Sequence, residues 1–361
     1  MTVKGIEIRN IYYMLAYAFK ALREGEYVRI ATEEFENAED LFGEILSLGV
    51  TRILKRGLHR MYETRAEEMS CVRGKISLPE TIRLMSADRR ELVCSHDEFT
   101  PNNAFNQILR STCEALVRTG KTKRSLPRLR RVISCLLDVD VVHLRQIHWA
   151  GLQYERNNAH YRMLMNICRL VVDGLLLSED TDSGDRCVRS VVIDEDRLAN
   201  LYECFLRNYY SVNFPQLNAA AKEIRWDVAE DSDASQLPKM VSDITLTDGK
   251  KTLILDAKFY GSIMQEHYEK HSYRNAHLNQ MVVYAMSDSA QTGRETAAML
   301  LYAKTGACAA RRGDWKLSGF RIGTRILDLS VPFVDIANQL DQIVIRAREF
   351  LAQRWLVRDS A

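Results

Sequence analysis

The sequence of 361 residues lacks the paired cysteines of a disulfide framework or a zinc ribbon. Its eight cysteines are scattered, with no C-x-x-C spacing, and a chain of this length can bury a core without covalent staples. It also lacks an apolar signal core near its start, and no stretch approaches the ~18 apolar residues of a membrane span. We therefore expect reduced thiols, a cytoplasmic location and no membrane partner.

An excess of charge of one sign is missing too. Fifty Lys and Arg nearly balance 48 Asp and Glu, which leaves a formal charge of +2 and excludes a nucleic-acid coat, so any DNA contact must be local. One basic run without acids stands out, made of Lys121, Lys123, Arg124, Arg128, Arg130 and Arg131. Such a run is either a solvated helix face or a surface for DNA phosphates or acidic partner loops.

The 46% apolar content over this length predicts a globular protein of two domains. The polar, acidic stretch 178–185 has the composition of an exposed connection. It divides the chain into an N-terminal domain of residues 1–178 and a C-terminal domain of residues 186–361. In the first domain, helical patterns and the strand-like region 62–93 alternate, which predicts a mixed α+β fold.

Periodicity predicts particular helices in the N-terminal domain. Residues 11–19 are apolar nearly all round, so they should form a buried helix with Asn10 as its N-cap. Further helical spacing is found at 38–56 and 103–119.

The C-terminal domain alternates helical and strand patterns in the order α, β, β, β, α, β. Asp248-Gly249 lies between two strand patterns, and this dipeptide strongly favours a tight hairpin turn. The expected elements are a helix at 194–210, strands at 224–228, 240–247 and 252–260, a helix at 274–287 and a strand at 297–302.

The predicted hairpin brings charged side chains together. A two-residue turn pairs residues whose numbers sum to 497, so Asp243 lies opposite Ile254. Because side chains alternate with a period of two, Asp256 and Lys258 are on the same face of the hairpin as Asp243. Asp243 and Asp256 are then diagonal neighbours, about 7 to 8 Å apart at the backbone. That is close enough for both carboxylates to bind one hard cation.

These residue types suit metal-assisted phosphodiester hydrolysis. Asp243, Asp256 and the carbonyl of Ala257 are candidate ligands for Mg²⁺. Lys258 would position the attacking water and offset charge that develops on the phosphate. The alternative is a buried ion pair in an ordinary hairpin, because short motifs of this kind often arise by chance.

A carboxylate on one strand, Asp-Ala-Lys on the next and the αβββαβ order resemble the PD-(D/E)XK nucleases, whose fold is that of restriction endonucleases. The chain is also similar to the McrC family, the nuclease subunits of McrBC modification-dependent restriction systems, from about residue 5 to 330. The blocks that carry this similarity are 10–18, 56–58, 73–76, 81–83, 237–246 and 253–260.

The resemblance implies a type IV restriction endonuclease subunit that cleaves double-stranded DNA containing 5-methylcytosine with Mg²⁺. It implies that the N-terminal domain docks on a hexameric AAA+ GTPase, McrB, and stimulates its GTP hydrolysis. GTP would be bound by that partner and not by this chain.

The nuclease motif of the family falls on Asp243, Asp256 and Lys258, with Ser242 where the superfamily often has proline. Two supporting residues are weaker candidates. Glu203 is either the additional acid of the superfamily or a surface carboxylate. Gln280 forms, with Tyr284, the Q-x-x-x-Y pattern seen after the lysine in many such nucleases, or belongs to an ordinary helix with a buried tyrosine.

Two other functions stay open at this stage. The chain could be a non-catalytic activator that bridges to the GTPase, in which case the carboxylates are structural. It could also be a stand-alone DNA repair nuclease of the same fold, which would cut without a partner or nucleotide.

Overall fold

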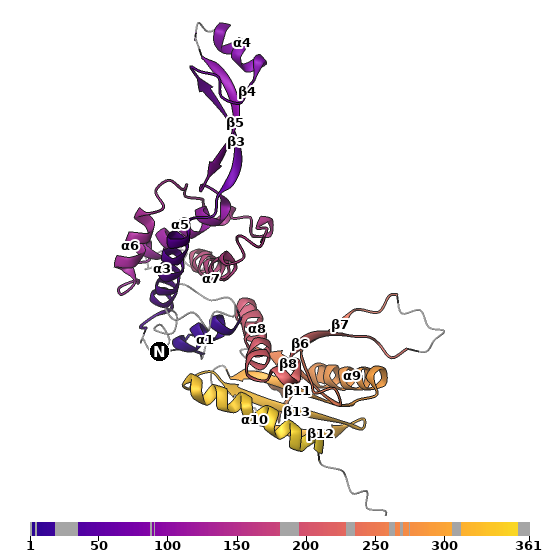
Figure 1. Cartoon of the computed structure of the whole chain (residues 1–361). Coiled ribbons are helices and arrows are strands. Elements are labelled where there is room, and N and C mark those ends of the chain that lie inside the picture. The colour runs from indigo at the N-terminus through magenta and orange to yellow at the C-terminus, as the bar shows by residue number, and fades with distance from the viewer. Residues whose placement is uncertain are drawn as a thin grey trace, which may run out of the picture. The chain divides into compact units, whose positions relative to one another are not determined.

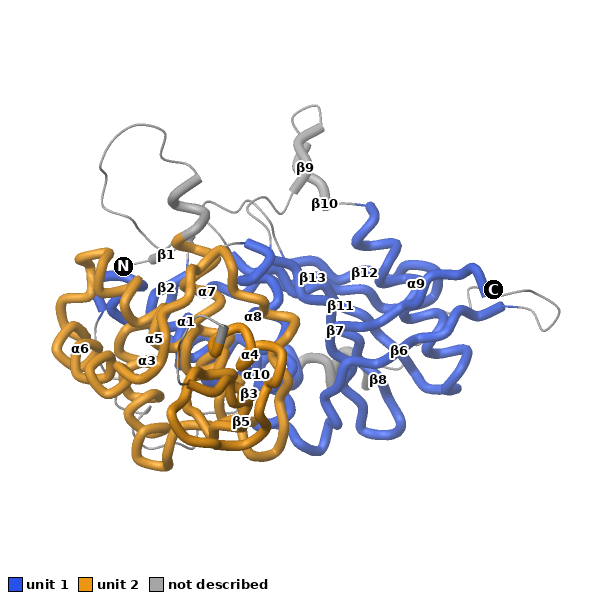
Figure 2. The backbone as a smooth tube through the Cα atoms, turned by 90° about the horizontal axis from the view of Figure 1, so that it is seen from above, with its two compact units in different colours: residues 1–41, 193–361 blue, residues 42–192 orange. Residues whose placement is uncertain are grey.

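The computed structural model divides into two compact units, one made of Met1–Leu41 and Ile193–Ala361, the other of Phe42–Val192 (Figure 2). Within the described ranges, no helix is both long and apolar enough to cross a membrane. Those ranges are 2–3, 6–18, 35–86, 89, 91–180, 195–228, 235–259, 264–267, 270–273, 275–304 and 312–352.

The first unit, built from the two ends of the chain, contains a six-stranded mixed sheet in the order β12-β13-β11-β8-β7-β6 (Figure 1). β8, β11 and β13 run parallel, while β6 and β7 add antiparallel strands on one side and β12 on the other. Their bounds are β6 (Ala220–Ile224), β7 (Met240–Thr247), β8 (Lys251–Lys258), β11 (Glu295–Lys304), β12 (Gly313–Leu317) and β13 (Phe320–Asp328).

Three helices of this unit pack on the sheet: α8 (Glu195–Asn213), α9 (Asn275–Thr292) and α10 (Phe333–Ala352). Ile254 and Tyr302 of the sheet join Met281 and Tyr284 of α9 in one buried apolar cluster. The central strands β8 and β11 are buried along most of their length, which explains their continuous apolar runs.

The predicted order is present as α8, β6, β7, β8, α9 and β11, so the mixed α/β class is confirmed. Two details differ. The first strand, β6, ends at Ile224, where the predicted strand 224–228 was to begin. A short antiparallel pair, β9 (Met264–His267) with β10 (Lys270–Tyr273), lies between β8 and α9; its polar residues carry no apolar alternation that would have predicted it.

Helix α1 (Ile8–Ala18) belongs to the sheet-containing unit, whereas we had expected residues 1–178 to form one N-terminal domain. Its apolar surface packs on α8, and the ring of Tyr13 stacks on Phe333 at 4.0 Å. Asn10 is not the N-cap, because the helix begins at Ile8. Its buried amide instead donates to the carbonyls of Leu329 and Val331, both at 2.8 Å, and so ties α1 to the chain after β13.

The second unit combines a helical body with a projecting arm (Figure 1). The arm is an antiparallel ribbon of β3 (Met61–Met69) and β5 (Leu92–Thr100), with β4 (Lys75–Ile76) at its far end. The strand-like prediction for 62–93 missed helix α4 (Leu78–Ser86) between β4 and β5. The body consists of α3 (Ala38–Arg56), α5 (Ala104–Arg118), α6 (Leu126–Ser134) and α7 (Tyr161–Asp180).

Most of the predicted interdomain stretch 178–185 lies outside the described residues, because the description stops at Asp180 and resumes at Glu195. The second unit is an insertion between α1 and α8 of the first unit.

The contacts of Asn10 predict its contribution to stability. Asn10→Ala removes two hydrogen bonds, one of them buried, while the Leu329 carbonyl still accepts from the N–H of Glu7. We expect the free energy of unfolding of this unit to fall by about 1 to 3 kcal/mol, measured by urea denaturation. Asn200→Ala is the control, because exposed Asn200 on α8 also donates to one backbone carbonyl. Equal effects of the two substitutions would contradict this role of Asn10.

Candidate functional site

The predicted hairpin forms, but its register differs from the predicted one. Ile244 lies opposite Leu255, and Thr247 lies opposite Thr252, so paired numbers sum to 499 and the loop has four residues. The side chain of Asp248 stabilises this longer loop by accepting from the N–H groups of Lys250 and Lys251. Because the shift is an even number of residues, every side chain keeps its predicted face.

The new register changes the predicted relation between the two acidic residues. Ile254 pairs with Thr245, so the predicted pairing of Asp243 with Ile254 was wrong. The β7–β8 ladder ends at Ile244 and Leu255, so Asp243 and Asp256 are the next residues beyond its last pair, one on each strand.

Beyond the last backbone pair of the ladder, the side chain of Asp243 forms the hydrogen bond between β7 and β8. Its Oδ2 accepts from the N–H of Ala257 at 2.7 Å. In an extended strand, the N–H and C=O of one residue point to the same side, so the Ala257 carbonyl faces the same gap between the strands. The N–H and the carbonyl of Ala257 thus lie at the same gap as the Asp243 carboxylate.

Asp256 is only 2% exposed, and its Oδ2 lies 2.6 Å from the Nζ of Lys258. The Lys258 ammonium therefore partners this oxygen, and it lowers the pKa of Asp256 against the effect of burial. A buried carboxylate is costly even when an ammonium group pairs with it. With Asp243 nearby, the site holds two carboxyl groups and one ammonium group.

The electrostatics agree with this geometry. Burial, followed by the Asp256 carboxylate, raises the pKa of Asp243 to about 7. Burial also raises the pKa of Asp256, although the Lys258 ammonium opposes it. Two carboxyl groups that resist ionisation side by side can both ionise when a cation lies between them.

Helix α8 brings Glu203 and Arg207 to the same site. The Arg207 guanidinium donates to Glu203 at 2.9 Å and to the carbonyl of Asp243 at 3.1 Å. The negative charge of Glu203 also contributes to the raised pKa of both aspartates. Arg207 is a site residue that the sequence analysis missed; its i, i+4 spacing from Glu203 was the available signal.

Helix α9 contributes Gln280 and Tyr284. The Gln280 amide donates to the Tyr284 hydroxyl at 3.0 Å, and this hydroxyl donates to the Val241 carbonyl at 3.2 Å. Burial raises the pKa of Tyr284, and the charges of Asp256 and Asp243 add to it. Gln280 is therefore linked through Tyr284 to β7, two residues before Asp243.

The donor set fits a hard cation such as Mg²⁺, which prefers oxygen ligands and keeps several waters. Among the described residues, no group of three or more His, Cys, Asp or Glu side chains has an arrangement that could hold a metal. The candidate ligands are accordingly two carboxylates, Asp243 and Asp256, and the backbone carbonyl of Ala257.

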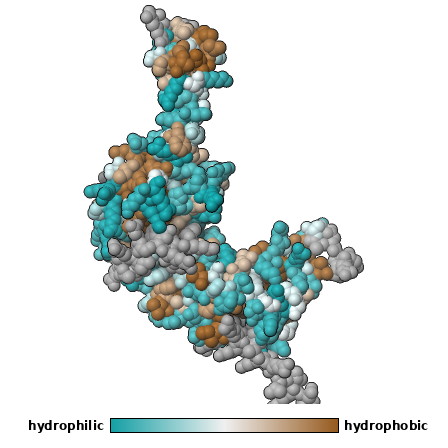
Figure 3. All heavy atoms as spheres, in the orientation of Figure 1, coloured by the Kyte–Doolittle hydropathy of each residue, from teal (hydrophilic) through white to brown (hydrophobic). Residues whose placement is uncertain are grey.

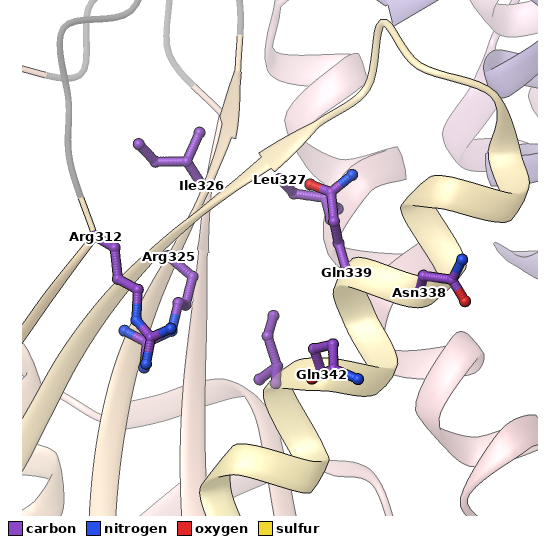
Figure 4. Close-up of a pocket in the computed structure, with 8 residues that line it drawn as sticks. Arg312, Arg325, Ile326, Leu327, Asn338, Gln339 and Gln342 are labelled. Carbon is purple, nitrogen blue, oxygen red and sulfur yellow. The ribbon is translucent and has the colours of Figure 1, made fainter.

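A pocket of about 320 Å³ lies elsewhere in this unit, between β13 and α10 (Figure 4). Two arginines and several carboxamides line it, but Arg325 already pairs with Asp314 at 2.7 Å and donates to the Gly313 carbonyl. Its lining holds no carboxylate or nucleophile. We therefore do not assign the chemistry to this pocket.

The arm of the second unit exposes apolar side chains at its end, where Figure 3 shows hydrophobic atoms gathered. We call these residues the arm-tip patch, and each is more than half exposed: Val72, Leu78, Ile82 and Met85.

The predicted basic run lies on α6 and the turn before it. Arg128 of this run pairs with buried Glu44 of α3, so at least this cation has a role within the unit.

Comparisons with known proteins agree on one family. A family model described as "McrBC 5-methylcytosine restriction system component" matches residues 4–303. The chain is 26% identical over 338 residues to "Type IV methyl-directed restriction enzyme EcoKMcrBC" of Escherichia coli (strain K12), covering 93% of this chain and 96% of that protein.

Two solved structures are also similar. One is a half-complex from a tetradecameric assembly of Thermococcus gammatolerans McrB AAA+ hexamers with bound McrC; it matches with a TM-score of 0.52 at 15% identity, over 94% of this chain and 76% of that chain. The other is the McrBC complex of the same organism, with a TM-score of 0.39 at 18% identity over 56% of each chain. The first likeness supports the fold, and the family match covers most of the sequence: this chain belongs to the McrBC 5-methylcytosine restriction system component family.

Proposed function

We propose that this chain is the DNA-cleaving subunit of a modification-dependent restriction system and hydrolyses phosphodiester bonds of duplex DNA with Mg²⁺. The observation that carries the proposal is the grouping of Asp243, Asp256 and Lys258 at the end of the paired part of β7 and β8, where burial raises the pKa of both carboxyl groups. Two carboxylates share one ammonium group there, and a hard cation would balance the remaining negative charge.

Each residue has a distinct role in this proposal. Asp243, Asp256 and the Ala257 carbonyl would hold the cation, which when bound neutralises the phosphate and lowers the pKa of a water ligand. Lys258, 15% exposed at its side chain and beside Asp256, orients the attacking water and offsets negative charge on the phosphate. Arg207 holds Glu203 beside the site, and Gln280 orients Tyr284 against β7.

The proposal extends to the partner and the substrate. The family description names 5-methylcytosine, and the similar assembly contains McrB AAA+ hexamers with bound McrC. We infer that this chain acts with an AAA+ GTPase of that kind, McrB, stimulates its GTP hydrolysis and cleaves DNA containing methylated cytosine. The arm-tip patch is the best candidate docking surface, because exposed apolar clusters of this kind mark protein interfaces.

Substitution of Lys258 tests the catalytic proposal. We expect Lys258→Ala to reduce cleavage of methylated plasmid DNA at least about 100-fold, in the presence of the partner, GTP and Mg²⁺, while stimulation of GTP hydrolysis stays intact. The matched control is Lys251→Ala, because Lys251 forms a 3.3 Å ion pair with Glu295 in the same sheet but lies at the opposite end of β8 from Lys258. If complexes with Lys258→Ala cleave the plasmid like wild type, the carboxylate cluster is structural and the chain is a non-catalytic activator. If the wild-type chain cleaves DNA without partner or GTP, it is a stand-alone repair nuclease.

The raised pKa of Asp243 predicts how stability depends on pH. Its folded-state pKa of about 7 lies above the ordinary 3.8, so the folded state binds this proton more tightly, and the stabilisation is lost as the pH rises from about 4 through about 7. We expect the melting temperature of metal-free protein to fall by several degrees between about pH 5 and pH 8, and to fall less in Asp243→Asn.

Magnesium should reverse that loss, because it offsets the repulsion between the two ionised carboxylates. Calorimetry at about pH 8 should show Mg²⁺ raising the melting temperature of the wild type and leaving that of Asp256→Asn unchanged. An identical Mg²⁺ response in both proteins would rule out this site as the metal site.

The docking proposal predicts the effect of making the arm-tip patch polar. We expect Leu78→Gln to weaken binding to the GTPase partner about tenfold or more, since a well-buried leucine contributes about 1.5 to 3 kcal/mol. Glu80→Gln, on the exposed face of the same helix, should bind like wild type. The affinity of each variant is measured by titrating it into the GTPase partner and following the stimulated rate of GTP hydrolysis. If Leu78→Gln reaches half-saturation at the same concentration as wild type, the arm-tip patch is not the docking surface.

A further inference from the structure

The arm needs an anchor at its root, the point where both of its strands join the helical body. A two-stranded ribbon with no third full-length strand is marginally stable by itself. Each strand has nine residues and spans about 30 Å at about 3.4 Å per residue. A tilt of about 10° at the root would therefore displace the far end by about 5 Å.

One side chain of α5 contacts both strands at this root. The amide of Asn106 donates to the carbonyl of His59, just before β3, at 2.9 Å and to that of Pro101, just after β5, at 2.7 Å. Asn106 is fully buried, and both hydrogens of its amide are used.

Helix α7 completes this network. The hydroxyl of Tyr161, its first residue, donates to Asn106 Oδ1 at 2.8 Å and accepts from the N–H of His59 at 2.9 Å. Asn103 adds a second donor to the His59 carbonyl at 2.7 Å. The rings of Phe105 and Tyr161 enclose the network, with centroids 5.5 Å apart.

We propose that Asn106 is a positioning residue that fixes both strands of the arm to α5 and α7, so that the arm engages the GTPase partner in one orientation. The Asn106 side chain is fully buried, and its amide donates to a peptide carbonyl on each side of the arm, so one rigidly held side chain ties both sides of the root to α5. The consequence for GTP hydrolysis rests on the proposed function, whereas the clamp itself does not.

Two substitutions test the clamp with the full chain. Asn106→Asp keeps the size of the side chain and the acceptor for Tyr161, but replaces the amide donor with an oxygen that faces two carbonyls. Tyr161→Phe is milder and removes the hydroxyl only. Asn166→Ala on α7 is the control, because its exposed amide donates to one carbonyl within its own helix.

The first readout is hydrogen exchange, which requires no partner. We expect Asn106→Asp and Tyr161→Phe to raise amide exchange at least about tenfold at the arm root, around His59 and Thr100, and to leave the sheet of the other unit unchanged. In the double variant, the rise in amide exchange should be smaller than the sum of the rises in the two single variants, because both substitutions act on one hydrogen-bond network. Root exchange like that of wild type in both variants would overturn the proposal.

The second readout is a titration of GTPase stimulation in the assembled complex. A misoriented arm lowers the maximal stimulated rate several-fold, whereas a mere loss of folded protein raises the amount needed for half-saturation and leaves that maximum unchanged. Raised root exchange with an unchanged maximal rate would overturn the positioning role. If wild type itself stimulates no GTPase, the proposed function fails, while hydrogen exchange still decides whether the clamp exists.

Discussion

The charges of two neighbouring carboxylates, buried Asp256 and half-buried Asp243, are the constraint on which the candidate site of the sheet-containing unit depends. Asp243 and Asp256 lie where β7 and β8 separate, and burial opposes the ionisation of both. The Lys258 ammonium pairs with Asp256, and the N–H of Ala257 donates to Asp243. The surrounding apolar core holds these groups in place, and that core gives their electrostatic interactions a strength they would not have in water.

The surrounding elements support this site from both ends of the chain. Helix α8 carries Glu203 and Arg207 to it, and α1, from the first residues of the sequence, packs on α8. The second unit is inserted between α1 and α8, so the N-terminal helix packs in the sheet-containing unit although the second unit separates it from α8 in the sequence. The arm in turn has its own anchor, in which Asn106 joins both strands to the helical body.

Several features could be predicted from residue patterns. The apolar spacing at 38–56 predicted α3, and the αβββαβ order followed from alternating periods. The short pair β9–β10 could not be predicted in this way, because it is short and carries little periodic signal. Helix α4 was missed although Leu78, Ile82 and Met85 recur at helical spacing, because Pro79 in its first turn resembles a break. The turn at Asp248-Gly249 was located correctly, but its length depends on hydrogen bonds from Asp248 that residue preferences do not specify.

The sequence by itself determined which face of the hairpin carries Asp243, Asp256 and Lys258, because side chains alternate with a period of two and an even shift of register preserves the face. Only the tertiary structure decided that Asp243 and Asp256 both follow the last pair of the β7–β8 ladder, that Arg207 bridges Glu203 to β7, and that α1 belongs to the same unit as the site. These features depend on contacts between segments far apart in the chain. Local periodicity holds no information about such contacts, since they follow from how apolar surfaces are buried against each other in three dimensions.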